Sequence, residues 1–152
     1  MKFSTRGRYG LRALLDLAVH GGDKMTPLKD IARREEISLH YLERLMAPLI
    51  SAGLVTSVRG VGGGVALSRA PAEIRVSEVI EALEGPIAPT ECAVDPSCCG
   101  RSGLCVSREV WSEMGRAIAG VLESTTLQDL ADRQMEKGQT QKRKKATDMY
   151  YI

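Results

Sequence analysis

Residues 26–67, TPLKDIARREEISLHYLERLMAPLISAGLVTSVRGVGGGVAL, contain the pattern that decides the fold. The initial Thr-Pro pair predicts the start of one short helix, and Ser38 predicts the N-cap of a second, because its hydroxyl can accept a free N–H of the first turn. Two β-prone segments, 54–58 and 65–67, follow and are joined by the glycine-rich residues 59–64. Two short helices followed by a hairpin are typical of a winged helix-turn-helix, with the hairpin as the wing.

Helical periodicity over most of the remaining chain predicts a mainly α fold. A first helix is predicted to begin at Ser4 or Thr5 and to end at a Gly-Gly pair. A further helix, capped by Ser77, is predicted over residues 78–83, after the hairpin.

One long helix is predicted over residues 107–123, and its apolar side chains recur with helical spacing. They are Val110, Trp111, Met114, Ala117, Ile118, Val121 and Leu122. This stripe is too long for a small domain to cover, so we expect it to pair with a second copy of the chain; an intramolecular core is the alternative. Thr126 and Asp129 predict a capping box for a last short helix. That helix is expected to end at about Lys137, and residues 138–152 are expected to be disordered.

Charge is distributed unevenly along the 152 residues. Residues 1–70 contain 11 Lys or Arg against 6 Asp or Glu, whereas residues 71–137 contain 6 against 12. The last segment, 138–152, contains 4 against 1. A basic first half beside an acidic second half suits a domain that meets phosphates joined to one that does not, although ordinary surface charge would account for the same numbers.

Composition argues against several classes of protein. The sequence has no run of about 18 uncharged apolar residues, so no membrane span is expected. Arg12 and Asp16 interrupt the first apolar stretch, which is unlike a signal peptide, and we expect a cytoplasmic protein. Neither a Cys-x-x-Cys pair nor a catalytic Ser/His/Asp set is evident, so an enzyme with a small-molecule substrate is not expected.

Four cysteines, Cys92, Cys98, Cys99 and Cys105, lie in one short loop, and the rest of the chain contains none. Because thiolates bind soft metals, they can converge on a single centre. A structural zinc site usually has more closely spaced pairs, and a disulfide between adjacent residues is strained. An iron–sulfur cluster needs soft thiolates on a flexible loop, which this segment offers, but spacing alone does not name the metal.

The second helix of the predicted helix-turn-helix would enter the major groove of DNA with its first residues nearest the base edges. Those residues are Ser38, His40, Tyr41, Glu43 and Arg44. Glu43 repels phosphate but can accept a hydrogen bond from cytosine N4, so a base-reading role is predicted, against the simpler alternative of a solvated helix face. Arg59, with Gly60 at the wing tip, is predicted to enter a narrow minor groove.

Three runs of sequence resemble the Rrf-type bacterial transcriptional regulators, typified by the iron–sulfur regulator IscR. They are residues 4–10 (STRGRYG), 37–43 (ISLHYLE) and 54–64 (LVTSVRGVGGG). The resemblance continues through the cysteine loop to Thr126 and Leu127, so it covers about residues 1–136.

The resemblance implies a homodimer that reads a pseudo-palindromic operator in double-stranded DNA. It implies DNA contacts from Ser38, Glu43 and Arg59, and it makes Ser4, Arg6 and Tyr9 at the start of the first helix candidates as well. Position 40 is His in this chain where IscR-like sequences often have Ser, so a different operator preference is expected.

The same resemblance implies an iron–sulfur cluster, two-iron or four-iron, held by three cysteines of the loop. Cys92, Cys99 and Cys105 match best, with Cys98 as a substitute for Cys99 or as a fourth ligand. In other members of the family, a fourth residue also binds the cluster, and the positions that supply it are Arg108 and Arg8 in this chain. A guanidinium has no free lone pair to offer a metal. Besides Cys98, the remaining sources of a fourth ligand are Glu109, a small molecule or the partner chain.

The sequence thus predicts four segments and a homodimeric DNA-binding regulator that senses iron, oxidants or nitric oxide through a cluster. The segments are a winged helix-turn-helix domain (1–85), a cluster-binding loop (86–106), dimerisation helices (107–137) and a disordered basic tail (138–152). The alternative is a cluster-free repressor of the same family that responds to a partner protein or to thiol oxidation.

Overall fold

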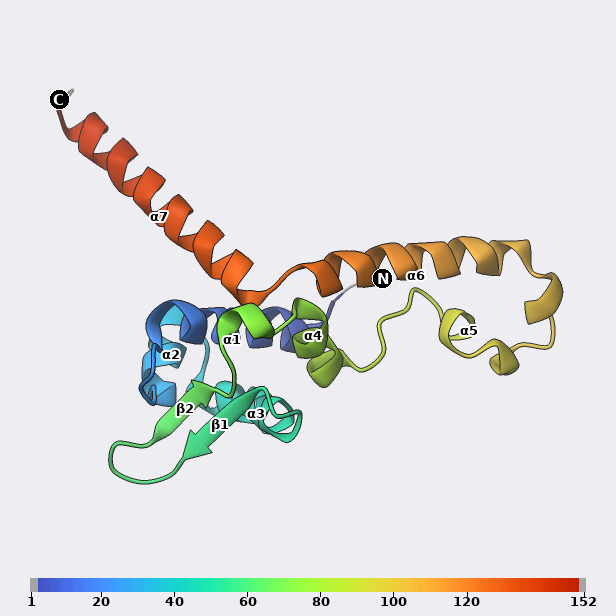
Figure 1. Ribbon diagram of the computed structural model, residues 1–152, viewed down its shortest axis with the longest axis horizontal. Helices are drawn as coiled ribbons and strands as arrows, with labels where there is room; N and C mark the ends of the chain where they lie inside the picture. Colours follow the sequence, from blue (N-terminus) through green and yellow to red (C-terminus); the bar gives the residue numbers. More distant parts are fainter. Residues whose placement is uncertain (1–2, 151–152) are drawn as a thin grey trace.

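The computed structural model describes residues 3–150. The first two residues of the predicted DNA-binding domain and the last two of the predicted tail lie outside the described residues. The described chain forms a compact N-terminal part, from which two long helices and the cysteine loop project (Figure 1).

Three helices form the centre of the compact part: α1 (Thr5–His20), α2 (Leu28–Glu35) and α3 (Leu39–Ser51). The predicted caps of α1 and α3 are confirmed. The Ser4 hydroxyl accepts the N–H of Arg6 at 3.1 Å, and the Ser38 hydroxyl accepts the N–H of Tyr41 at 3.2 Å. Each bond satisfies a backbone donor that the first helical turn would otherwise leave free.

The predicted wing is an antiparallel hairpin of β1 (Val55–Val58) and β2 (Gly64–Leu67), with Val55 opposite Leu67. Thr26 does not cap α2, so that prediction was wrong. Its backbone instead exchanges two hydrogen bonds with Val65, at 2.8 and 2.9 Å, and adds a short third edge to the hairpin. A Cβ at Gly64 would lie 2.3 Å from the Thr26 carbonyl oxygen, so this close approach requires glycine.

Helix α4 (Val76–Glu84) follows a short turn over Pro71–Glu73. The predicted cap at Ser77 was wrong. The helix begins at Val76, so Ser77 is buried inside its first turn. The N-terminus of α4 is satisfied by the Glu78 carboxylate, which accepts the Arg75 N–H at 2.9 Å.

The hydrophobic core joins α1, α2, α3, the wing, α4 and the start of α7. Its fully buried side chains include Leu14, Ile31, Leu42, Leu45, Leu49, Leu54, Val65, Ile74, Val79 and Leu127. Leu127 is distant in sequence, and its N–H donates to the Ile74 carbonyl at 3.0 Å, which anchors the C-terminal part of the chain on the core.

The projecting part contains the short helix α5 (Glu91–Val94), the long helix α6 (Val106–Ser124) and α7 (Leu127–Tyr150). Figure 1 shows the cysteine loop at the far end of α6, with α7 leaving the compact part in another direction. The extent of α6 agrees with the helix predicted over 107–123. None of the helices in the described range is long and apolar enough to span a membrane.

The Thr126–Asp129 capping box at the start of α7 is confirmed. The Asp129 carboxylate accepts the Thr126 N–H at 2.8 Å, and the Thr126 hydroxyl accepts the Asp129 N–H at 3.1 Å. The predicted end of this helix at Lys137 was wrong, because α7 continues to Tyr150. Residues 139–150 contain no proline and are rich in Gln, Lys and Arg, which favour helix even where little is buried. The single glycine before them, Gly138, does not end the helix.

Replacing Leu42 with Ala should destabilise the fold by about 2–5 kcal/mol, because the fully buried side chain would leave a cavity beneath the recognition helix. Urea unfolding followed by circular dichroism measures this change. The matched control is Leu104→Ala in the exposed loop, which we expect to shift stability by less than about 0.5 kcal/mol. Equal effects of the two substitutions would contradict the assignment of Leu42 to the core.

Candidate nucleic-acid interface and cysteine loop

Two ion pairs fix α2 against α1 and thereby support the helix-turn-helix. The Arg34 guanidinium donates to both carboxylate oxygens of Asp16, at 2.7 and 2.6 Å, although the Asp16 side chain is only 1% exposed. This hydrogen bond raises the pKa of Arg34 further above its ordinary value. Arg12 donates to the Glu35 carboxylate at 2.8 Å and to the Glu35 carbonyl at 2.7 Å.

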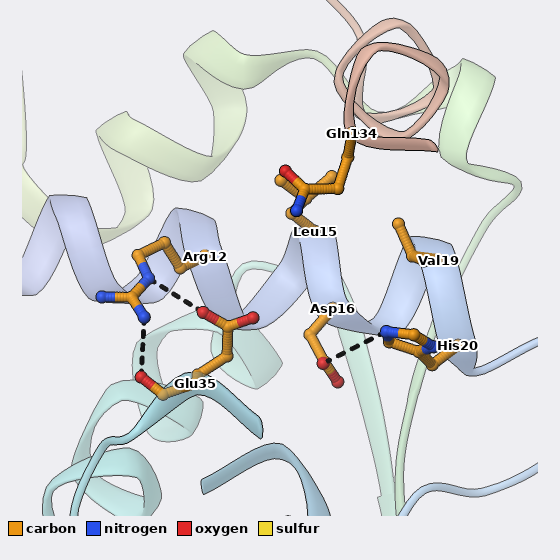
Figure 2. A pocket seen from close by; sticks show the side chains of 7 residues that line it. All are labelled: Arg12, Leu15, Asp16, Val19, His20, Glu35 and Gln134. Carbon is orange, nitrogen blue, oxygen red and sulfur yellow. Dashed lines mark hydrogen bonds and ion pairs between the residues drawn. The ribbon is translucent and has the colours of Figure 1, made fainter. Parts of the chain in front are cut away.

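These ion pairs border a polar cavity of about 380 Å³ where α1, α2 and α7 meet. Figure 2 shows Arg12 against Glu35, His20 facing Asp16, and Gln134 of α7 reaching the same space. No sequence pattern described above predicts this contact between α1, α2 and α7. An acidic residue among the apolar positions of α1 was the available signal, because a buried carboxylate needs a cation.

The exposed start of α3 displays three of the predicted base-reading residues. Ser38 caps the helix, and His40 and Glu43 follow with side chains that are 85% and 55% exposed. His40 Nδ1 and Glu43 Oε2 are 4.0 Å apart. Both side chains are therefore free to face a ligand outside the protein.

The N-terminal half of α1 lies beside α3, the predicted recognition helix. The predicted DNA-contacting residues of the two helices are therefore close together. Tyr9 and Tyr41 pack edge to face with ring centroids 6.1 Å apart, and Arg12 lies over the Tyr9 ring at 5.2 Å. Arg6 of α1 and Arg44 of α3 line one concavity of about 200 Å³ together with Tyr41. Two arginines from different helices thus line one concave surface, which suits a phosphate.

The wing forms the other side of this surface. Arg59, Gly60 and Glu43 line one groove of about 580 Å³ between α3 and the hairpin. The turn at the tip is closed by the Gly63 N–H, which donates to the Gly60 carbonyl at 3.0 Å. Gly60 has a φ of +97°, a conformation that L side chains rarely adopt, so the thin tip depends on glycine.

The cysteine loop presents its four thiols at different depths. Cys92 on α5 and Cys105 before α6 are half-buried, whereas Cys98 and Cys99 are exposed. The sulfur of Cys105 lies 3.2 Å from the Ser107 hydroxyl, and this hydrogen bond lowers the pKa of the thiol. Desolvation and the negative charge of Glu91 raise the pKa of Cys98.

Arg108, in the first turn of α6, contacts the segment that carries Cys92. Its Nε donates to the backbone carbonyl of Cys92 at 2.8 Å, so the first turn of α6 holds the helix that carries Cys92. The guanidinium therefore orders the loop through its donors and cannot supply electrons to a metal.

The donor set fits a soft metal in its chemistry, since four thiols share one exposed loop. Within residues 3–150, however, the structure brings no three His, Cys, Asp or Glu side chains close enough to hold a metal ion. The cluster and its ligands Cys92, Cys99 and Cys105 stay predictions, as does the role of Cys98.

The capped helix α3, the glycine-tipped wing and the supporting α1 form a winged helix-turn-helix, the fold of a class of DNA-binding regulators, which confirms the predicted fold class. The family model of Rrf2, the iron-dependent transcriptional regulators, matches residues 3–133, and the chain belongs to this family. The expectation that the protein is not an enzyme is confirmed by this membership.

Similar proteins include the regulators CymR and IscR. The regulator CymR of Bacillus subtilis is 45% identical over 131 residues, covering 86% of this chain and 90% of CymR. Its solved structure, described as the global cysteine regulator, has a TM-score of 0.73 and covers 88% of this chain and 98% of CymR. The structure of IscR from T. potens is 39% identical, also with a TM-score of 0.73, and 90% of each chain is covered.

Replacing Arg108 with Ala should loosen α5, because the hydrogen bond to the Cys92 carbonyl is lost. We expect faster amide hydrogen exchange over residues 91–95 without a change in overall helix content. Hydrogen exchange read by mass spectrometry measures this. Arg116→Ala, an exposed change on the same helix, is the control. Equal exchange in the two variants would show that Arg108 does not hold the loop.

Proposed function

We propose that this protein is a homodimeric transcriptional regulator whose affinity for a pseudo-palindromic operator depends on an iron–sulfur cluster in the cysteine loop. One observation carries the proposal: the loop is tied to the first turn of the long helix, through Cys105 at its start and through Arg108 bound to Cys92. A change in the loop therefore acts directly on α6.

The proposal of a homodimer is supported by the surface of α6. No residue of this helix is buried, and the apolar side chains Trp111 and Val121 remain 37% and 66% exposed. A continuous apolar stripe of this kind needs a partner, and a second copy of the chain gives a symmetric contact of identical stripes. The two recognition helices then face neighbouring turns of one DNA face.

The proposed DNA surface combines the three elements described above. Glu43 and His40 on α3 would read base edges in the major groove, Arg59 at the wing would enter the minor groove, and Arg6 and Arg44 would bind phosphates. The remaining members of the proposed set, Ser4, Tyr9, Ser38, Tyr41 and Gly60, would position these groups or approach the backbone of DNA. Ser4 and Ser38 also serve as helix caps, in which the hydroxyl oxygen accepts a backbone N–H.

Cys92, Cys99 and Cys105 would hold the cluster, with Cys98 as a substitute for Cys99 or as a fourth ligand. A bound cluster would supply a centre that is gained, lost or oxidised according to iron and oxidant supply. The residues of the chain would transmit this change. Arg108 and Cys105 would couple the conformation of the loop to α6, and α6 would set the distance between the two DNA-binding parts of the dimer. Operator spacing is fixed by the duplex, so a small change in that separation changes affinity.

The cluster-free alternative has its own supporting observation. Cys98 and Cys99 are exposed, and exposed thiols can respond to oxidants without any metal. Among similar structures is an oxidised form of CymR from Staphylococcus aureus, 39% identical, with a TM-score of 0.67 and covering 86% of this chain. In this alternative the same α6 connection would transmit the state of a thiol.

Replacing Arg59 with Ala should weaken operator binding and lower the slope of log affinity against log salt by about 1, because one phosphate-region cation is lost. Fluorescence anisotropy at several salt concentrations measures both quantities. Arg116→Ala removes the same charge from α6 and should leave binding unchanged. An unaltered affinity for Arg59→Ala would remove the wing from the proposed interface.

Replacing Cys92 or Cys105 with Ala should abolish the iron content and visible absorption of anaerobically purified protein while a folded dimer remains. Iron and acid-labile sulfide assays with sedimentation analysis test this. Cys98→Ala is the matched variant and should retain colour if Cys99 is the third ligand. Colour retained in both Cys92 and Cys105 variants would place the cluster elsewhere, and a colourless wild-type protein that binds the operator would favour the cluster-free alternative.

A further inference from the structure

A single carboxylate at the end of α4 holds the beginning of α1. Oε1 of Glu84 accepts the backbone N–H of Ser4 at 3.0 Å and that of Gly7 at 2.9 Å, and it also accepts the Ser4 hydroxyl. The same hydroxyl accepts the Arg6 N–H. A continuous series of hydrogen bonds therefore leads from Glu84 through Ser4 to the backbone of Arg6.

The electrostatics of this contact favour the charged carboxylate. The N-terminus of a helix has partial positive charge, so an ionised Glu84 is stabilised there. The hydrogen bond from the Ser4 hydroxyl, together with those from the Gly7 and Ser4 amides, lowers the pKa of Glu84 below its ordinary value.

Two glycines of α1 make the approach of α4 possible. A Cβ at Gly7 would lie 2.5 Å from Glu84 Oε1, and a Cβ at Gly10 would lie 2.2 Å from Cδ1 of Leu83. Both glycines are buried in this contact. The fit between the two helices thus depends on Gly7 and Gly10 of α1 and on Leu83 and Glu84 of α4.

Glu84 also stands between the two functional parts of the chain. On one side, Gly85 has a φ of +80° and turns the chain out of α4 toward Pro86 and the cysteine loop. On the other side, Arg6 shares its concavity with Tyr41 and Arg44 of the recognition helix. The Glu84 carboxylate therefore connects the end of α4, where the chain leaves for the cysteine loop, to the first turn of α1.

We infer that Glu84 is a positioning residue for operator binding, which fixes the first turn of α1 so that Arg6 lies beside Arg44 for one DNA phosphate. The inference rests on the proposed contact between Arg6 and DNA. It adds a route by which a shift of the segment after α4 reaches the interface within one protomer, independently of the separation of the two protomers.

The test compares Glu84→Ala, Glu84→Gln and Arg6→Ala, each alone and the Ala changes combined, in the full-length protein. Operator affinity is measured by fluorescence anisotropy, and thermal unfolding is measured in parallel. Glu84→Ala should weaken binding about tenfold, and Glu84→Gln should recover part of it, because the amide oxygen still accepts hydrogen bonds. Glu81→Ala, an exposed carboxylate on the same helix, should bind as the wild type does.

The combined variant separates positioning from general destabilisation. If Glu84 acts through Arg6, Glu84→Ala should cause little further loss of affinity once Arg6 is Ala, while its effect on the melting temperature persists. Additive losses of affinity would overturn the inference but leave the Arg6 contact standing. Wild-type affinity for Arg6→Ala would overturn both.

A second variant covers the case in which Glu84→Ala does not fold. Gly7→Ala keeps the charge but pushes the carboxylate away from the α1 amides, and it should reproduce the loss of affinity. A folded Gly7→Ala protein with wild-type affinity would contradict the role of this contact.

Discussion

Helix α1 is the element on which every other part of the structure depends, because its different faces are covered by different partners. Leu14 and Leu17 contribute to the hydrophobic core. Asp16 binds Arg34 of α2, and Gly7 and Gly10 admit the end of α4. The C-terminal helix α7 also packs on α1. A single helix thus fixes the positions of the DNA-reading helix pair, the segment that leads to the cysteine loop and the base of the projecting helices.

The local features of the fold could be predicted from sequence, and the features that failed depend on distant residues. The caps at Ser4 and Ser38 and the Thr126–Asp129 box need only neighbours within one helical turn, so short patterns identified them. Thr26 was predicted to be a cap because Pro27 follows it, but its backbone is hydrogen-bonded to Val65, which lies 39 residues away in strand β2. The concavity that joins Arg6 to Arg44 and the anchor at Glu84 likewise require tertiary contacts that no local pattern contains.

The cysteine loop and the DNA-facing surface are joined by two separate physical connections. Arg108 and Cys105 connect the loop to α6, where the unpartnered apolar stripe lies. The segment after Gly85 connects the same loop to α4 and hence to the start of α1. The two ends of one loop therefore enter different parts of the fold. In the proposed regulator, a single event among the thiols would act on both the pairing of protomers and the surface of each. Both a cluster and a thiol reaction could use these connections.

The backbone bridge between Thr26 and Val65 has a consequence for how such regulators diversify. It connects the hairpin to the residues that lead into α2, so the wing is fixed to the helix-turn-helix through backbone hydrogen bonds. In the proposed interface, this fixed backbone would accept new promoters through exchange of exposed side chains at the start of α3, such as the histidine at position 40. New operator specificities in this fold would then evolve through substitutions of exposed side chains, while the backbone arrangement is conserved.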